Sequence, residues 1–192
     1  EDPNHKAHCV VLEYGERSLA DYLKRGVLQR NERTVIVDRL ANVVQHMHAQ
    51  NVVHCDLKPH NFVLFGLKWK VIDLENARRV SEPVSMRVSP SYCSPELARA
   101  VLSKQTERMR ATCAIDMWSL GLIIFELFAR QAFFADKPDT MQQLASYAEL
   151  EVPKDVVDDI QARHMLKKVL VKNHLDRANV QAILKHAYLC GG

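Results

Sequence analysis

Apolar residues recur at helical spacing over most of the chain. From Asn31 to Met47 they return every three or four positions, which predicts an amphipathic helix with one buried face. A shorter helix over residues 18–26 begins at the capping residue Ser18 and ends at Gly26. The later part of the chain is expected to be helical over residues 95–102, 114–129, 140–149, 154–171 and 179–188.

Strands are expected in only two places. Residues 8–12 are a short apolar run that ends in a turn-like connector, and this run predicts a strand. Residues 62–65 and 69–72 are apolar runs joined across Gly66, which predicts a hairpin. Residues 81–95 are rich in serine and proline without periodicity, so we expect a long loop there.

Composition and charge narrow the class of protein. The chain has 192 residues, of which 47% are hydrophobic and 26% charged, as in an ordinary globular domain. Its net charge is only +3 and no run of five or six like charges occurs, so we expect neither nucleic-acid nor membrane-surface binding. The longest apolar run, residues 114–129, contains Asp116 and Glu126 and is shorter than the roughly 20 residues of a membrane span.

Cysteines and histidines show no metal-binding spacing. The five cysteines are odd in number and widely separated, which favours reduced thiols and a cytoplasmic or nuclear protein. A zinc site around His54, Cys55 and His60 is disfavoured because neighbouring residues do not converge on one ion. His46 and His48 face different directions on their helix, so we expect surface or packing roles for them.

Polar residues that suggest chemistry lie between the long helix and the hairpin. Residues 52–65 have the sequence VVHCDLKPHNFVLF, which contains Asp56, Lys58 and Asn61, and Asp73 follows the hairpin. Phosphoryl transfer from Mg-ATP requires a carboxylate that orients a hydroxyl, a cation for the γ-phosphate and oxygen ligands for magnesium. Alone the pattern is weak, because a polar loop of these residues is also typical of a solvated turn.

Two further motifs follow in order, SPSYCSPE at residues 89–96 and IDMWSLGLIIFEL at residues 115–127. With HCDL at 54–57, Asn61 and DLE at 73–75, the chain resembles the protein kinase family, whose motifs H-R-D-L-x-x-x-N, D-F-G and A-P-E occur in this order. The resemblance implies the α+β protein-kinase-like fold, represented mainly by its mostly α-helical C-terminal lobe with a short β hairpin. Residues 1–17 then correspond to the last strand and hinge of the N-terminal lobe, and residues 18–190 to the C-terminal lobe.

The resemblance also implies an activity and its residues. The chain is similar to serine/threonine kinases, which transfer the ATP γ-phosphate to protein substrates with Mg²⁺. Asp56 matches the catalytic base, and Lys58 matches the cation near the transferred phosphate that is typical of the serine/threonine class. Asn61 completes the catalytic set and, with Asp73, matches the two magnesium ligands.

The nucleotide site follows from the same resemblance. Glu13, Tyr14 and Gly15 match the hinge, whose backbone binds the adenine. Val63 matches the apolar floor beneath the adenine, and Leu12 the gatekeeper.

Structural residues are implied too. Ser89 matches a residue that contacts the catalytic loop, and Asp116 one that holds the backbone of that loop. Glu96 and Arg177 match a buried ion pair.

The chain departs from the family pattern at two positions. Cys55 replaces the arginine that clamps a phosphorylated activation loop, so control through Ser85 is not expected. Glu75 replaces the glycine of D-F-G, where we expect backbone strain and an additional carboxylate next to Asp73.

No Gly-rich loop and no V-A-I-K lysine precede residue 8. We expect a fragment of a longer kinase, with the missing N-terminal lobe or attached regulatory domains as partners. The alternative is a catalytically impaired pseudokinase lobe that acts as a protein-binding scaffold. Asp56, Lys58, Asn61 and Asp73 favour the enzyme, whereas Glu75 and the absent N-terminal lobe favour the scaffold. The docking segment argues against a small-molecule phosphotransferase.

Overall fold

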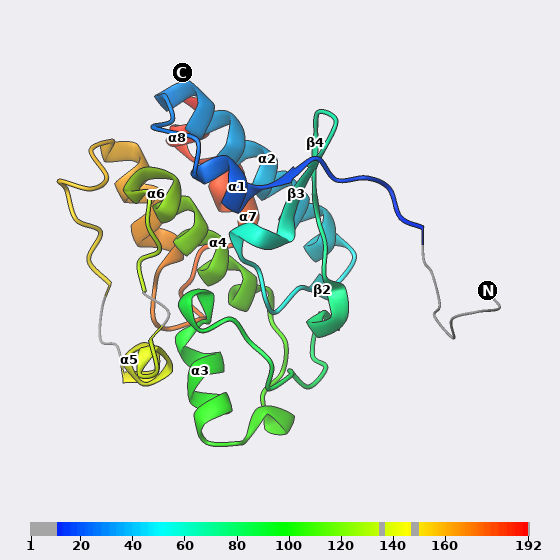
Figure 1. Ribbon diagram of the computed structural model, residues 1–192. Coiled ribbons are helices and arrows are strands. Elements are labelled where there is room, and N and C mark those ends of the chain that lie inside the picture. The colour runs from blue at the N-terminus through cyan, green and yellow to red at the C-terminus, as the bar shows by residue number, and fades with distance from the viewer. Residues whose placement is uncertain (1–10, 135–136, 147–149, 192) are drawn as a thin grey trace.

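The computed structural model describes residues 11–134, 137–146 and 150–191. Helices dominate these ranges, and the strands are short (Figure 1). The α-helices are α1 (Leu19–Leu23), α2 (Arg30–Ala49), α3 (Pro95–Leu102), α4 (Cys113–Ala129), α5 (Thr140–Ser146), α6 (Ile160–Val169), α7 (Val180–Leu184) and α8 (Ala187–Cys190). The strands are β1 (Arg17–Ser18), β2 (Val52–Val53), β3 (Phe62–Phe65), β4 (Lys68–Val71) and β5 (Arg78–Arg79). Single 3₁₀ turns occur at Pro59–Asn61, Leu74–Asn76, Pro90–Tyr92 and Thr106–Arg108.

The strands form two small antiparallel sheets. One has the order β1-β3-β4, and the other pairs β2 with β5. The predicted hairpin is confirmed, with Phe62 opposite Val71 and Phe65 opposite Lys68. Gly66 in its two-residue turn has φ +60, a left-handed conformation that glycine adopts without steric cost.

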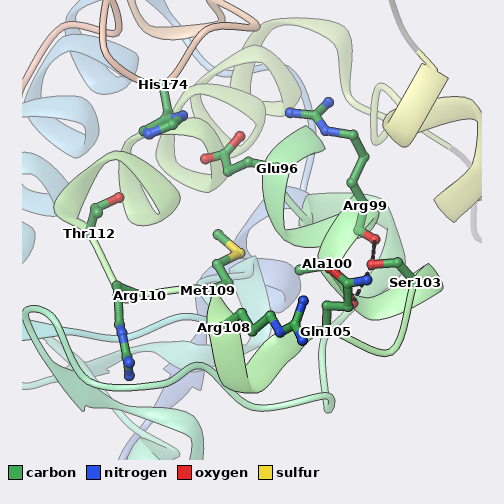
Figure 2. A pocket seen from close by; sticks show the side chains of 10 residues that line it. All are labelled: Glu96, Arg99, Ala100, Ser103, Gln105, Arg108, Met109, Arg110, Thr112 and His174. Carbon is green, nitrogen blue, oxygen red and sulfur yellow. Dashed lines mark hydrogen bonds between the residues drawn. The ribbon is translucent and has the colours of Figure 1, made fainter.

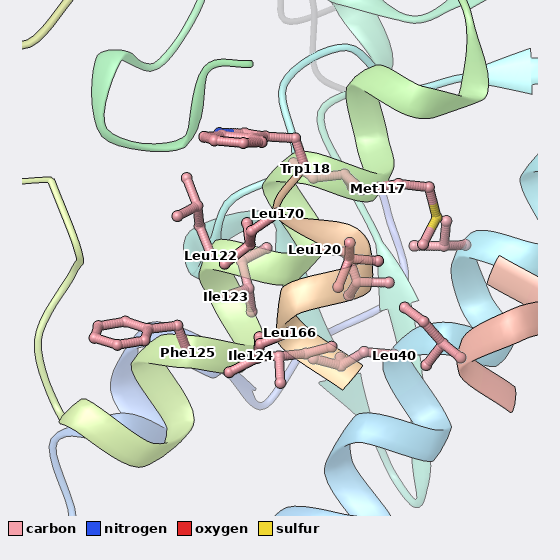
Figure 3. Packing of buried hydrophobic residues seen from close by; sticks show 14 of the residues in the cluster. Leu40, Met117, Trp118, Leu120, Leu122, Ile123, Ile124, Phe125, Leu166 and Leu170 are labelled. Carbon is pink, nitrogen blue, oxygen red and sulfur yellow. The ribbon is translucent and has the colours of Figure 1, made fainter. Parts of the chain in front are cut away.

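Helix α4 lies at the centre of the hydrophobic core. It packs against α2 and α6, and most of its side chains are buried on all sides. Figure 3 shows Leu40 of α2 on one side of α4 and Leu166 of α6 with the adjoining Leu170 on another. This enclosure explains why the α4 sequence is apolar all round rather than along one stripe. Within the described residues, no helix has both the length and the apolarity that a membrane span requires.

Most predicted helices are confirmed, but two boundaries were wrong. Helix α6 begins only at Ile160, because the Asp159 side chain accepts hydrogen bonds from the backbone N–H groups of Gln161 and Ala162 and so caps the helix. The predicted helix 179–188 is divided into α7 and α8, because His186 caps α8 at that point. Residues 147–149 of another predicted helix lie outside the described residues.

The first predicted strand is displaced. Residues 8–10 lie outside the described residues, while Val11 and Leu12 are exposed and belong to no strand. The edge of β3 pairs instead with Arg17–Ser18. Because a strand requires a backbone partner, the position of β3 decides where β1 forms.

The predicted long loop over residues 81–95 is anchored along its first half. Ser81 N–H donates to the carbonyl of Ala111 (2.9 Å), and Val84 N–H donates to that of Met109 (3.2 Å). The second half contains the 3₁₀ turn Pro90–Tyr92. The loop therefore has a defined course beside the segment that precedes α4.

Candidate active site

Asp116 of α4 holds the backbone of the loop that follows β2. Its two carboxylate oxygens accept hydrogen bonds from the backbone N–H groups of His54 (2.8 Å) and Cys55 (2.9 Å). Asp116 is fully buried, so these bonds form away from competing water. The predicted role of Asp116 is confirmed.

His48 of α2 completes this anchor and was missed from the sequence. Its Nε2 lies 2.9 Å from Oδ2 of Asp116. Burial lowers the pKa of His48, but hydrogen bonds to Asp116 and Cys113 and the Asp116 charge outweigh it and raise the pKa to about 9. His48 lies four residues after Val44 and seven after Ala41, on the buried face of α2, and this spacing was the available signal.

Asp56, Lys58 and Ser89 form one hydrogen-bonded group. Lys58 Nζ donates to Oδ2 of Asp56 (3.1 Å) and to the Ser89 hydroxyl (2.9 Å). The backbone N–H of Ser89 donates to Oδ1 of Asp56 (2.8 Å). The predicted contact of Ser89 with this loop is therefore confirmed. The Asp56 carboxylate and the Lys58 ammonium group lie side by side.

His54 and Asn61 connect this loop to the segment that carries Asp73. The N–H of Asp56 donates to Nδ1 of His54 (3.3 Å), so Nε2 carries the ring proton and donates to the Ile72 carbonyl (3.1 Å). The N–H of Ile72 donates in turn to the carbonyl of Asn61 (2.9 Å). Asp73 follows Ile72 in the chain, so this bond brings its backbone next to Asn61.

Backbone strain falls on Asp73 and not on Glu75. Asp73 is exposed and has φ +65, an uncommon left-handed conformation that aspartate tolerates better than most residues. The strain predicted at Glu75 was wrong, because Glu75 lies in the 3₁₀ turn Leu74–Asn76 and has no positive φ. Its exposed carboxylate lies 3.8 Å from the guanidinium of Arg87.

Asn61 and Asp73 offer the oxygen ligands that magnesium prefers. The Asn61 amide nitrogen donates to the Asp56 carbonyl (3.0 Å), which leaves the amide oxygen as its free acceptor. Among the described residues, no group of three or more His, Cys, Asp or Glu side chains is arranged to hold a metal ion. An amide and a carboxylate nevertheless fit Mg²⁺, which commonly keeps several waters and binds phosphate oxygens.

Of the residues predicted to bind adenine, Gly15 and Val63 meet at the edge of β3. A Cβ added at Gly15 would lie 2.5 Å from Cγ1 of Val63, so only glycine allows the chain to pass this close. The next residue, Glu16, donates its N–H to the Leu64 carbonyl (2.8 Å). Glu13 and Tyr14 are exposed, and the Glu13 carboxylate pairs with Lys70.

The predicted ion pair between Glu96 and Arg177 is confirmed. Two guanidinium nitrogens of Arg177 donate to the two Glu96 oxygens, at 2.7 and 3.0 Å. Arg177 also donates to the carbonyl of Ala114 (2.6 Å), and its guanidinium lies over the ring of Trp118. The pair therefore connects the start of α3 with α4 and the segment before α7.

Tyr92 and Glu126 form a second link that the sequence did not indicate. The Tyr92 hydroxyl donates to Oε2 of Glu126 (2.6 Å), and Ser119 donates to the Tyr92 carbonyl (2.8 Å). Burial raises the pKa of Glu126, against the effect of the Tyr92 hydrogen bond. A carboxylate in an otherwise apolar helix was the only signal. Both bonds hold the turn after Ser89 against α4.

Cys55 is uncharged at the position where the family motif has a cationic arginine. It is buried with φ +66, and burial raises the pKa of its thiol to about 12. The thiol is therefore neutral at physiological pH. The four described cysteines, Cys55, Cys93, Cys113 and Cys190, are free, as expected.

Comparisons with known proteins agree with this geometry. Residues 3–189 match the family described as protein kinase domain. The chain is 26% identical to the serine/threonine-protein kinase MPS1 of Encephalitozoon cuniculi, with 95% of this chain and 31% of that protein aligned. It is 27% identical to rat serine/threonine-protein kinase ULK3 (86% and 35%) and 29% identical to mouse serine/threonine-protein kinase PLK2 (95% and 26%). The chain thus spans about a third or less of each relative.

Proposed function

Because the chain belongs to the protein kinase family, we propose that it is the catalytic and substrate-binding part of a protein serine/threonine kinase. In this proposal it takes part in transfer of the ATP γ-phosphate to serine or threonine hydroxyls of protein substrates, with Mg²⁺. Residues 18–190 form the C-terminal lobe, and residues 1–17 lead into it from the N-terminal lobe. The observation that carries the proposal is the bonded group of Asp56, Lys58 and Ser89.

Asp56 orients the attacking hydroxyl and accepts its proton. Its carboxylate is held by Lys58 on one oxygen and by the Ser89 N–H on the other, so its position is defined before substrate binds. Because Lys58 is bonded to Asp56, it would place its positive charge against the phosphate that moves to the hydroxyl. This preorganised charge is the main protein contribution to phosphoryl transfer.

Asn61 and Asp73 would hold the magnesium ion through their side-chain oxygens. The metal, when bound, neutralises charge on the ATP phosphates. The backbone link between Ile72 and Asn61 keeps these two ligands adjacent. Glu13, Tyr14 and Gly15 would bind the adenine through their backbone above Val63, with Leu12 as gatekeeper.

The conformation of Glu75 supports the enzyme over the impaired scaffold. Besides the absent N-terminal lobe, the sequence argument for the scaffold was that Glu75 cannot take the backbone angles of glycine without strain. At Glu75 no such angles occur, and its carboxylate faces Arg87 in solvent. An active kinase therefore remains compatible with glutamate at this position.

The proposal is tested by phosphate transfer from γ-labelled ATP to a generic protein substrate, in the full-length protein that contains this chain. Replacing Asp56→Asn keeps the size of the side chain but removes the base, so turnover should fall by ~10² or more. The matched control is Asp155→Asn, at an exposed position, which should retain the parent activity. Parent-like turnover of Asp56→Asn would contradict the proposal.

A further inference from the structure

A pocket between α3, the 3₁₀ turn Thr106–Arg108 and the start of α4 is lined by several cationic side chains. Its volume is about 460 Å³, within the usual range for ligand sites. Arg108 is the last residue of the 3₁₀ turn Thr106–Arg108, Arg110 lies two residues after it, and Arg99 belongs to α3. Glu96 is the acidic residue in the lining, and it is already neutralised by Arg177. The pocket therefore presents excess positive charge.

The cations at this pocket have no acidic partners in the part of the chain that the structure describes. No carboxylate there forms an ion pair with Arg108 or Arg110. Both arginines are exposed, so their guanidinium groups are free to meet an anion from outside. Figure 2 shows the two groups pointing in different directions, so one small anion would not reach both.

Thr112 contributes an unused hydroxyl to the same pocket. It is the N-cap residue of α4, yet its side chain makes no capping hydrogen bond. Its Oγ1 is buried and finds no partner among the described residues. A buried polar atom without a partner is costly, so a turn of the Thr112 side chain that brings its hydroxyl to a bound ligand would relieve that cost. The N-terminal end of α4 adds a partial positive charge nearby.

We propose that this pocket binds an extended acidic segment of a protein partner. Carboxylates from separate positions of that segment pair with Arg108 and Arg110, and the Thr112 side chain turns so that its hydroxyl bonds with the backbone of the segment. Met109 and Ala100 supply an apolar patch between the charged groups. None of Asp56, Lys58 and Ser89 lines this pocket, so binding there does not depend on phosphate transfer.

Two residues that line the pocket are bonded through their backbone to the loop that carries Ser89. Met109 bonds to Val84 through its backbone carbonyl, and Arg110 forms a β-bridge with Pro83. A partner bound to Arg108 and Arg110 would therefore contact the segment whose backbone is paired with residues 83–84 of that loop.

The test is a fluorescence-anisotropy titration of the full-length protein, without nucleotide. The probe is a fluorescein-labelled peptide of alternating glutamate and leucine, beside a matched peptide in which glutamine replaces glutamate. Binding of the acidic peptide should weaken at least fivefold in the double variant Arg108→Ala, Arg110→Ala, because two ion pairs are lost. It should also weaken as NaCl rises from 50 to 300 mM, since salt screens exposed charges.

Two controls make the result specific. Arg39→Ala removes an exposed arginine of α2, and it should bind the acidic peptide as the parent does. Thr112→Val keeps the side-chain shape without the hydroxyl, and it should weaken binding at least twofold. Equal binding of the glutamine peptide, or parent-like binding by the double arginine variant, would overturn the proposal. Binding of a phosphoserine peptide but not of the glutamate peptide would also overturn it.

Discussion

Arg177 should contribute strongly to stability through its buried contacts. Its guanidinium is buried and bonds to both oxygens of Glu96. Arg177→Ala leaves the Glu96 charge without compensation, so we expect the free energy of unfolding to fall by ~3–5 kcal/mol. Denaturant titration measures this loss, and Arg99→Ala, at an exposed position of the same helix as Glu96, should change it little.

A double-mutant cycle shows whether the two residues act as a pair. In Glu96→Ala, Arg177→Ala both charges are gone, so the loss should be smaller than the sum of the single losses by more than ~1 kcal/mol. Strictly additive losses would mean that Glu96 and Arg177 do not interact in solution.

His48 should make stability depend on pH in the alkaline range. Its pKa is raised from 6.5 to about 9 in the folded state, so its stabilising effect is complete below pH 6.5 and disappears as pH rises through 9. The stability difference between the parent and His48→Gln should therefore shrink by roughly 2–4 kcal/mol from pH 6 to pH 9.5. Urea titrations at both pH values measure it.

His46→Gln is the matched control for this experiment. His46 lies on the exposed side of the same helix, so the substitution should leave the pH dependence unchanged. A constant difference between the parent and His48→Gln across this range would show that His48 carries no stabilising proton.

At the scale of elements, the contact between α4 and the end of α6 depends on Gly121. A Cβ at this position would lie 2.7 Å from Cδ2 of Leu170, which is itself buried. Gly121→Ala gains about 1 kcal/mol of helix propensity, but overpacking costs about 1–3 kcal/mol. We therefore expect a net loss of stability, measured as a lower denaturation midpoint.

Relief of the same clash provides the check. Leu170→Ala removes the atoms that an alanine at 121 would meet, so Gly121→Ala should be neutral or stabilising in that background. If Gly121→Ala lowered stability equally in the parent and in Leu170→Ala, contact with Leu170 would not be the cause of the loss.

At the scale of the whole molecule, the central position of α4 should appear in hydrogen exchange. Amides in the middle of α4 are enclosed by α2 and α6, so they should exchange only when the whole domain unfolds. Amides at the tip of the β3–β4 hairpin should exchange much faster, because Gly66 and Leu67 are exposed. Exchange measured by mass spectrometry would contradict this picture if α4 exchanged as fast as the hairpin tip.

The local pattern of the sequence was sufficient to predict most of the helices, the hairpin and the chemical groups of the candidate site. The spacing of apolar residues predicted α2, because burial of one face imposes a period on the sequence. Continuous apolar runs predicted α4 and the hairpin, because α4 is buried on all sides and the strands are short. The order of the motifs around Asp56, Asn61, Asp73 and Glu96 pointed to the family, since each group serves a chemical or structural requirement that few other residues meet.

Only the tertiary structure decided which groups meet and how they are charged. The raised pKa of His48 depends on a carboxylate 68 positions away in α4, and the place of β1 depends on the free edge of β3. The Thr112 hydroxyl, which has no partner among the described residues, and the cations around it come together at one pocket only through packing. Hydrogen bonding, desolvation and strand pairing depend on distance in space, and a one-dimensional pattern records such distances only for near neighbours along the chain.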